Sequence, residues 1–539
     1  MAAKEFNLLH EPWVRVLKYD GSVDELSLTE VFAKAENYRG LGGELPTQDL
    51  AVLRLLLAIL HTVVERVDAH GNLRPIKSPA EALERWQGYW RLGRLPSDVI
   101  ERYLLGYEDR FWLFHDEFPF YQIPGLEDNG TAYKASKLNG ELLQSNNKIR
   151  LFPLRTGELQ DLLSYSEAAV WLLHVIGFDD NASKSPKKLP SPGAGWLGQL
   201  GLMWAEGDSL FETLLLNLVL LPNGELGSSP SPVWERKEIK TEERTEIPVP
   251  SNLAALYTLQ SRRIMLQRSE AGVVAFRLLG GDYFAKEDAL LEQMTLWRKS
   301  KPKKNGPEEI KPRRHDPAKQ MWRNLAVLVG QADDSRRPGI VGWLARLKAE
   351  EKLDRTHFRF RIAGAEYGDK DFFIKDIFED SLHLNSDLLT SLGEDWLLRV
   401  IGEIALTERL VWQLGVFANE LALAAGDDPG RDNGTAAREQ AYFKLDQPFR
   451  QWLSAIDPIK DADKKEEKCE QWWQIARNIV RQEADILLDK AGAKAFIGRE
   501  LKVKKDGKET TRRYTGPEAH NNFLYRTSSR EALFGKERI

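Results

Sequence analysis

The apolar pattern changes character near residue 385. After that point four stretches follow the 3.6-residue period of a helix and no stretch alternates as a strand does. The expected helices are 396–425, 436–456, 466–488 and a last segment near 517–533. Four helical segments joined by polar connections predict a four-helix bundle, so residues 385–539 form an expected C-terminal bundle domain.

The residues before 385 mix helical and strand patterns. A strand pair is expected around the turn Asp20-Gly21, and a buried helix follows Pro46, with Thr47 as its N-cap. Further strands are expected at 263–267, 273–278 and 358–362, and an irregular stretch at 118–154. Because 539 residues exceed what one core organises, the predicted class is α+β, with a large mixed α/β domain over 1–384.

Composition limits where the protein works. The only cysteine, Cys469, allows no intrachain disulfide, which favours a reducing cytoplasm. The N-terminus shows no secretory signal, and the apolar runs 53–60 and 214–221 are far shorter than the roughly 20 residues that cross a bilayer. We therefore expect a cytoplasmic protein without membrane contact.

Motifs for catalysis are missing from the sequence. The nine histidines form no H-E-x-x-H or H-x-x-x-H pair, and neither a Walker A loop nor a G-x-S-x-G elbow occurs. His61 and His174 sit in apolar helical stretches, where buried core histidines are expected. The sequence predicts a protein that is not an enzyme and holds no metal or cofactor.

An acidic run is the one feature that favours an alternative. The run comprises Glu366, Asp369, Asp371, Asp376, Glu379 and Asp380. Convergent carboxylates can hold two metal ions, so a metal-dependent nuclease is the alternative hypothesis. The interleaved Lys370 and Lys375 weaken it, and a solvated turn leading into a helix is the favoured interpretation of 366–380.

Positive charge is concentrated in two places although the net charge is -5. Residues 298–323 hold ten Lys/Arg against three Asp/Glu, and residues 490–515 hold nine against three. The first segment is either a solvated loop or a mobile cationic arm that contacts phosphates. Upstream, Gly193-Ala194-Gly195 allows close approach of backbone to a ligand, although a plain turn is the favoured interpretation of this motif taken by itself.

Taken in order, several segments resemble the CasA family, the large subunit of the type I-E CRISPR Cascade complex. The matching features are Asn7, Leu8, Leu9, Trp13 and Val14, then 44–49, 118–122, the glycines near 193, Lys303-Lys304 and 364–371. The resemblance spans nearly the whole chain and rests on order and spacing. It implies the same division into a mixed α/β domain and a C-terminal four-helix bundle.

The resemblance also implies a function. Members of that family recognise the protospacer-adjacent motif of double-stranded DNA through its minor groove and open the first base pairs. Their partners are other Cascade subunits, the crRNA, target DNA and a helicase-nuclease recruited after target binding. Some relatives hold zinc through paired cysteines, which this sequence lacks.

Family roles carry over by position. Gly193, Ala194 and Gly195 are similar to the glycine loop, Lys304 or its neighbour Lys303 to the minor-groove lysine, and Asp369, Lys370 and Asp371 to the wedge; Phe152 resembles the loop that docks at the crRNA-handle end. The chain has Lys370 where relatives place a glutamine. We expect Gly368 to adopt φ > 0 and present Asp369 and Lys370 at a tip.

Replacing Lys303→Ala together with Lys304→Ala is expected to weaken target binding across many flanking sequences. The lysine-rich turn would neutralise phosphates or touch minor-groove acceptors, so its loss flattens the salt dependence of binding. Binding titrations at several salt concentrations measure both effects. Unchanged affinity and salt slope in the double variant would remove this turn from the DNA site.

Overall fold

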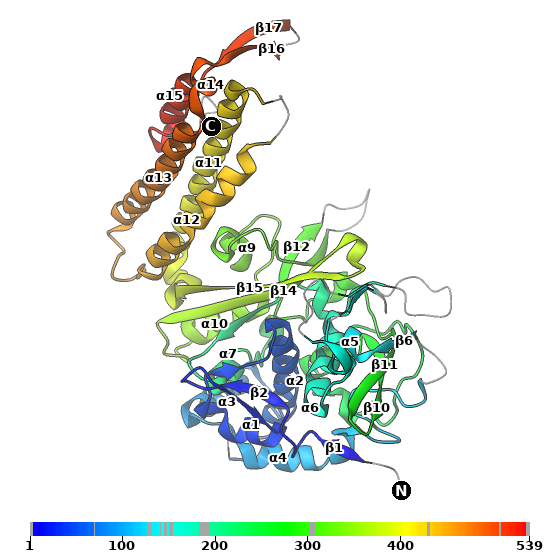
Figure 1. Ribbon diagram of the computed structural model, residues 1–539. Helices are drawn as coiled ribbons and strands as arrows, with labels where there is room; N and C mark the ends of the chain where they lie inside the picture. Colours follow the sequence, from blue (N-terminus) through cyan, green and yellow to red (C-terminus); the bar gives the residue numbers. More distant parts are fainter. Residues whose placement is uncertain are drawn as a thin grey trace. The chain divides into compact units, whose positions relative to one another are not determined.

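The computed structural model describes residues 4–68, 70–126, 131–140, 142–144, 148–149, 155–182, 193–300, 308–427, 432–505 and 508–534. The chain divides into two compact units (Figure 1). Unit 1 comprises Met1–Met321 and Ala326–Ser381, and unit 2 comprises Trp322–Leu325 and Leu382–Ile539. The predicted boundary between 384 and 385 falls inside the strand β15 (Ile374–Asn385).

Unit 1 mixes helices and strands, which confirms the predicted mixed composition. Its α-helices are α1 (Leu28–Lys34), α2 (Pro46–Val64), α3 (Pro79–Leu92), α4 (Ser97–Leu105), α5 (Ala135–Leu138), α6 (Tyr165–Phe178), α7 (Leu210–Leu216), α8 (Leu253–Tyr257), α9 (Leu325–Leu328, which begins in unit 2) and α10 (Gly339–Ala349). Short 3-10 turns connect many of these elements.

The strands of unit 1 form several small sheets. Among the residues that the structure describes, three of these sheets have three strands each, in the orders β3-β2-β4, β10-β11-β6 and β15-β14-β9, and three have two, β1-β5, β7-β8 and β12-β13. Their bounds are β1 (Glu5–Asn7), β2 (Val14–Leu17), β3 (Val23–Leu26), β4 (Gly40–Leu41), β5 (Trp112–Phe114), β6 (Thr131–Lys134), β7 (Leu142–Gln144), β8 (Lys148–Ile149), β9 (Met203–Glu206), β10 (Arg262–Ser269), β11 (Gly272–Gly280), β12 (Leu296–Ser300), β13 (Glu309–Arg313) and β14 (His357–Tyr367).

Helix α2 is the central element of the unit 1 core. It packs against α6 and α8, and its residues from Leu50 to Val64 are all buried. By length and composition α2 could cross a membrane, but 94% of its apolar window is buried inside the protein, as in a core helix. Thr47 was expected as N-cap, but the cap is Leu45, and the Thr47 hydroxyl instead pairs with His174 Nε2 at 3.1 Å.

Several sequence predictions for unit 1 are confirmed. Strands β2 and β3 pair around Gly21, which has φ +86°, and the strands expected at 263–267, 273–278 and 358–362 lie within β10, β11 and β14. Both predicted core histidines are buried, and burial lowers the pKa of His174 to about 3. The irregular stretch predicted over 118–154 was wrong in part, since it contains β6, α5, β7 and β8.

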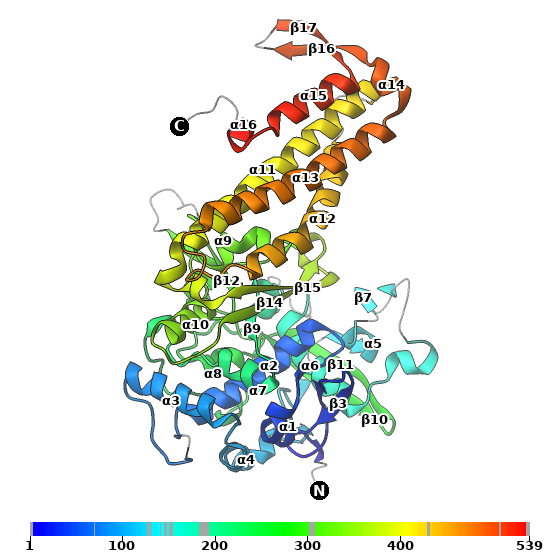
Figure 2. The same ribbon diagram turned by 90° about the vertical axis from the view of Figure 1, so that its left-hand side faces the viewer.

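Unit 2 consists mainly of long helices (Figure 2). These are α11 (Glu394–Ala425), α12 (Gly434–Ser454), α13 (Lys465–Lys490), α14 (Gly492–Ile497), α15 (Gly516–Arg526) and α16 (Arg530–Phe534). Helix α11 packs against α12, α13 and α15. Between α12 and α13 the rings of Phe449 and Trp472 meet edge to face at 4.9 Å. A strand pair, β16 (Arg499–Lys505) and β17 (Lys508–Tyr514), lies between α14 and α15 and was not predicted.

Trp322 belongs to unit 2 although it lies far from that unit in sequence. Its ring is fully buried and stacks on Phe449 at 4.3 Å, while its indole Nε1 donates to Asp446 at 2.9 Å. The sequence does not indicate that Trp322 belongs to unit 2, because the residues on either side of 322–325 belong to unit 1.

Trp322→Ala is expected to lower the free energy of unfolding of unit 2 by about 3–5 kcal/mol, because it leaves a cavity beside Phe449. Chemical denaturation measures the free energy of unfolding, and hydrogen exchange at the amides of α12 shows whether the loss lies in unit 2. Trp412→Ala on α11 is the matched control, since that ring is 59% exposed. Equal losses in the two variants would contradict the assignment of Trp322 to the core of unit 2.

Candidate nucleic-acid interface

The predicted glycine loop packs against the end of helix α6. The Gly195 amide donates to the Asp179 carbonyl at 2.8 Å, and a Cβ at Gly195 would lie 2.4 Å from the Gly177 carbonyl oxygen. Gly193 has φ +76°, a conformation that suits glycine, and Ala194 is buried. The motif therefore meets a structural demand for small residues, with Ala194 and Gly195 buried and Gly193 half-buried.

A buried arginine fixes this loop. Arg262 opens β10, is 1% exposed, and donates from Nη2 to the Gly193 carbonyl at 2.6 Å. The same guanidinium donates from Nε to the Asp179 carboxylate at 2.5 Å and from Nη2 to the Asp180 carbonyl at 3.0 Å. The sequence analysis did not single out Arg262. The one signal in the sequence is the pair Arg262-Arg263 at the start of an apolar strand.

The predicted wedge is the tip of the β14–β15 hairpin. Residues Asp369–Asp371 form a 3-10 turn, closed where the Gly368 amide donates to the Phe373 carbonyl at 2.9 Å. The expectation that Gly368 has φ > 0 was wrong, since its φ is -72°. A Cβ at Gly368 would lie 2.2 Å from the Phe373 ring, so a larger residue there requires that ring to move. Lys370 and Asp371 take the positive φ instead, at 51° and 61°.

Such backbone strain costs on the order of 1–3 kcal/mol per residue and persists only where surrounding contacts enforce it. Here Arg314 holds the Asp371 carboxylate with two hydrogen bonds of 2.9 Å. Asn181 also holds the tip. Its backbone N–H donates to the Asp371 carbonyl at 2.7 Å, and its side-chain Nδ2 donates to the Lys370 carbonyl at 2.9 Å. The Lys370 side chain stays exposed.

The segment 178–181 therefore contacts both predicted DNA elements. Asp179 and Asp180 meet the glycine loop and Arg262, and Asn181 meets the hairpin tip. Tyr367, at the end of β14, donates its hydroxyl to the Phe178 carbonyl at 2.6 Å, and burial raises its pKa well above the usual range. The glycine loop and the hairpin tip, about 175 residues apart in the sequence, are therefore neighbours, because both contact the segment 178–181.

The acidic run does not form a metal centre among the described residues. Asp371 pairs with Arg314, Glu366 with Lys375 at 2.6 Å, and Glu379 with Arg361. In those parts of the chain that the structure describes, no group of three His, Cys, Asp or Glu could hold a metal ion. The run was expected to lead into a helix, which was wrong, because it leads into β15.

Comparison with known proteins identifies the family. Residues 7–482 match the family described as CRISPR-associated protein Cse1. The chain belongs to the Cse1 family. The predicted resemblance to CasA is thereby confirmed, since CasA and Cse1 are two names for the same protein in Thermus thermophilus.

Individual relatives agree with this assignment. The CasA/Cse1 protein of Thermus thermophilus is 32% identical over 276 residues, which make up 50% of either chain, so this match spans about half of the curated relative. The crystal structure of Thermobifida fusca Cse1 is 30% identical with a TM-score of 0.81, covering 99% of this chain and 98% of that one. A chain of a CRISPR RNA-guided surveillance complex shares the fold, with a TM-score of 0.66 at 16% identity over 90% of this chain and 100% of that one.

Three predicted site residues of this Cse1 chain cannot be placed. Lys303, Lys304 and Phe152 lie outside the described residues. The flanks of the two lysines are strands, because β12 pairs with β13 from Leu296↔Arg313 to Ser300↔Glu309. The basic segment 298–323 was expected to be a loop throughout. This was wrong in part, because β12 and β13 flank its middle part, 301–307, which lies outside the described residues.

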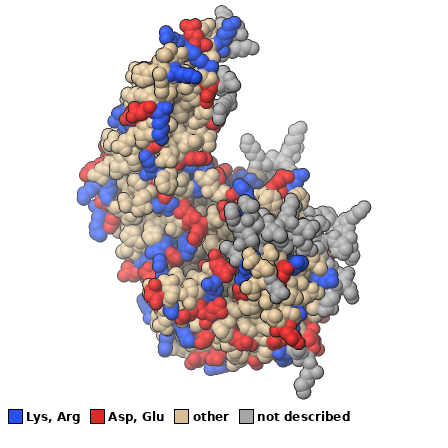
Figure 3. All heavy atoms as spheres, in the orientation of Figure 1, with Lys and Arg blue, Asp and Glu red and all other residues tan. Residues whose placement is uncertain are grey.

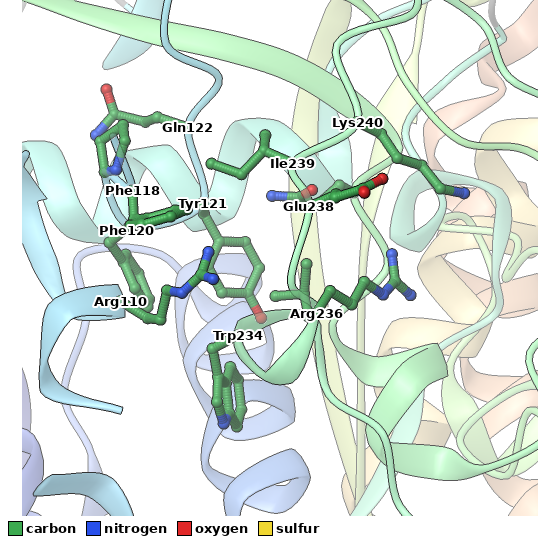
Figure 4. A pocket seen from close by; sticks show the side chains of 13 residues that line it. Arg110, Phe118, Phe120, Tyr121, Gln122, Trp234, Arg236, Glu238, Ile239 and Lys240 are labelled. Atoms are coloured by element: carbon green, nitrogen blue, oxygen red, sulfur yellow. The ribbon is translucent and has the colours of Figure 1, made fainter. Parts of the chain in front are cut away.

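The family segment 118–122 lines a separate pocket of the Cse1 chain (Figure 4). Arg110 stacks on Phe118 with 3.7 Å between the guanidinium and the ring centre, and Trp234, Arg236 and Lys240 complete the rim. The Gln122 side chain forms hydrogen bonds inside the protein: it donates to the Leu113 carbonyl at 2.6 Å and accepts from the Leu266 amide at 2.8 Å. The segment thus ties β5 to β10.

Arg314→Ala is expected to release the strained tip, so that amide exchange at Asp371 and Asn181 becomes several-fold faster. Lys375→Ala on the same hairpin removes an exposed ion pair and is the matched control, expected to leave both rates unchanged. Hydrogen exchange read by NMR or mass spectrometry makes the comparison. If both variants exchange at the parental rate, Arg314 does not hold the tip.

Proposed function

We propose that this Cse1-family chain is a non-catalytic subunit of a crRNA-guided antiviral surveillance complex. In this role it recognises the protospacer-adjacent motif in double-stranded target DNA and helps open the duplex for guide pairing. It also provides a landing surface for the recruited helicase-nuclease. The family membership and the fold shared with a chain of a solved surveillance complex support this proposal.

The observation that carries the proposal is the shared support of the glycine loop and the hairpin tip. A motif reader must be close to the base pairs that are opened next, because opening begins beside the motif. The segment 178–181 supplies that proximity, with Gly195 bonded to Asp179 and Asp371 bonded to Asn181. Small residues in the loop suit close approach to a groove, and the exposed Lys370 suits insertion at the duplex.

The physical character of the minor groove sets an expected limit on specificity. The hydrogen-bond donors and acceptors in the minor groove distinguish A·T from G·C pairs but largely not the orientation of each pair. A protein that binds this groove is therefore expected to tolerate several motifs. Pairing with the guide then supplies sequence specificity. In this scheme the glycine loop contacts the motif through Gly193, together with Lys303 or Lys304, while the buried Ala194 and Gly195 set the shape of the loop. Asp369, Lys370 and Asp371 separate the strands.

The remaining roles follow from the same resemblance. Phe152 docks at the crRNA-handle end of the complex, and the helices of unit 2 form the family's four-helix bundle. We further propose that the complex works in the cytoplasm without membrane contact or cofactor. A metal-dependent nuclease is not proposed, because Glu366, Asp371 and Glu379, which would belong to its centre, are each paired with a cation.

An electrophoretic comparison tests the function. Cascade assembled with and without this chain is titrated with targets that differ only in the flanking motif. Motif-dependent binding is expected only with the chain present. Equal binding to all targets in both preparations would overturn the motif-reading role, and Mg²⁺- or Mn²⁺-dependent cleavage of labelled duplex by the purified chain would overturn the non-catalytic one.

Lys370→Ala is expected to leave motif-dependent encounter largely intact and to slow formation of the RNA–DNA hybrid. Separating the first base pairs costs a few kcal/mol before guide pairing offsets it, so a side chain that holds them apart acts on opening. Permanganate footprinting of unpaired thymines beside the motif measures opening directly. Lys370→Gln, the residue found in relatives, should preserve it, and Lys375→Ala controls for loss of charge on the hairpin. Normal opening kinetics in Lys370→Ala would show that Lys370 is not the wedge.

A further inference from the structure

The pocket beside the family segment 118–122 is not used by any role proposed above. That segment supplies part of its lining, and residues 233–240 supply another part (Figure 4). Both segments belong to unit 1. The cavity volume is about 40 Å³, which is room for roughly three water molecules. A ligand would therefore place one small group inside the pocket and keep the rest of its atoms outside.

Tyr121 lines this pocket and has two features typical of a binding position. Its φ of +55° lies in the left-handed region, which is strained for a tyrosine. Its side chain is buried, and its hydroxyl has no hydrogen-bond partner in the part of the chain that the structure describes. Burial raises the pKa of Tyr121 well above its usual range, although the nearby Arg236 opposes the rise. The hydroxyl therefore keeps its proton and is a donor without an acceptor.

Gln260 supplies a second donor. It also lines the pocket and is only 7% exposed. Its backbone is fixed, because its carbonyl accepts from the Asp282 amide at 2.9 Å. Its side-chain amide forms no hydrogen bond to any residue that the structure describes. Buried amides are normally hydrogen-bonded, so this one also suits a ligand that accepts a hydrogen bond.

Arg110 is a cation of the lining without an acidic partner among the described residues. Its guanidinium stacks on the Phe118 ring at 3.7 Å and donates one long hydrogen bond, of 3.5 Å, to the Lys237 carbonyl. Partial burial lowers the pKa of Arg110, because it removes water from the charge. An anion placed here would replace the lost hydration with charge-assisted hydrogen bonds.

Arg236 and Lys240 line another part of the pocket and share a single buried carboxylate. The Asp282 Oδ2 atom lies 3.9 Å from Arg236 and 3.8 Å from Lys240, beyond hydrogen-bond distance. Arg263 already donates to the Oδ1 atom of Asp282 at 2.5 Å. Among the lining residues, Glu238 is the one further carboxylate, and it is exposed. Three cations of the lining thus outnumber its acids.

The cations of the lining come from two sides. Figure 4 shows Arg110 on the side of Phe118, and Arg236 and Lys240 on the opposite side of the Tyr121 ring. On the face of unit 1 that Figure 3 shows, Lys/Arg and Asp/Glu side chains are interspersed. The excess of cations at the pocket is therefore local, as a site for a single anionic group requires.

We propose that this pocket binds a phosphate monoester group between Arg110 on one side and Arg236 and Lys240 on the other. A monoester carries a charge of about −1.5 to −2 at neutral pH, which matches the excess of cations better than the single charge of a phosphodiester. Its three terminal oxygens are about what the cavity holds, and they accept from the Tyr121 hydroxyl and the Gln260 amide. Free nucleotides and the phosphorylated end of a nucleic-acid strand both carry this group.

Isothermal titration calorimetry of the full-length chain tests the site with three ligands that share one nucleoside. Adenosine 5′-monophosphate is expected to bind and adenosine is not. Cyclic 3′,5′-adenosine monophosphate, a diester, should bind about tenfold more weakly or less, because it offers one charge fewer to the three cations. Equal binding of the monophosphate and adenosine, or of the monophosphate and the cyclic diester, would overturn the proposal.

Two variants locate the binding. Tyr121→Phe removes a hydroxyl that has no partner, so the melting temperature should stay the same or rise, while the affinity for adenosine 5′-monophosphate should fall about tenfold. Arg236→Ala/Lys240→Ala should abolish binding. The matched control, Arg91→Ala/Arg94→Ala, removes two exposed arginines of unit 1 and should bind as the parent does. Parental affinity in both pocket variants, or an equal loss in the control, would contradict the assignment of the site.

A third comparison distinguishes the two sources of the group. Fluorescence anisotropy measures binding of one single-stranded oligonucleotide with a 5′-phosphate or a 5′-hydroxyl. Tighter binding of the phosphorylated strand that is lost in Tyr121→Phe supports the proposal with a strand end as ligand. Equal binding of the two strands, with the free nucleotide still bound, supports it with the nucleotide as ligand. None of these measurements uses a flanking motif, so they do not depend on whether the chain recognises one.

Discussion

The buried guanidinium of Arg262 is the interaction on which the candidate interface depends. It joins the start of β10, the end of α6 and the glycine loop through Asp179, Asp180 and Gly193. Removing one partner of a buried ion pair commonly costs about 3–5 kcal/mol, because the other charge is left without compensation. The neighbouring Ser261 adds a second link, since its hydroxyl donates to the Ile176 carbonyl at 2.5 Å. The position of the loop is thus set from inside the protein.

The hairpin tip is held differently, by contacts that oppose strain. Two consecutive non-glycine residues in the left-handed region are unfavourable, and the hydrogen bonds from Arg314 and Asn181 compensate for them. Strain of this kind collects at functional positions, where a side chain has to be presented in a fixed direction. Lys370 is presented in this way, with its backbone fixed and its ammonium group in solvent.

The two basic segments illustrate how charge and secondary structure combine. Both were evident as excess Lys/Arg, and both prove to be flanked or formed by antiparallel strand pairs, β12–β13 and β16–β17. Successive residues of a strand point to opposite faces, so each pair spreads its charges over two faces. Positive charge can therefore act locally although the chain as a whole is acidic.

The sequence by itself determined the mixed composition of the first part, the long helices after residue 394, the buried histidines and the family. These follow from periodicity and from the order of motifs, which are local properties of the chain. The partners of Arg262, Asn181 and Arg314 were decided only by the tertiary structure, because each contact joins residues distant in sequence. The positive φ expected at Gly368 lies instead at Lys370 and Asp371, whose carbonyls accept hydrogen bonds from Asn181, a residue distant in sequence. Tertiary contacts also place Trp322 in unit 2, where its ring stacks on Phe449, although its neighbours in the sequence belong to unit 1.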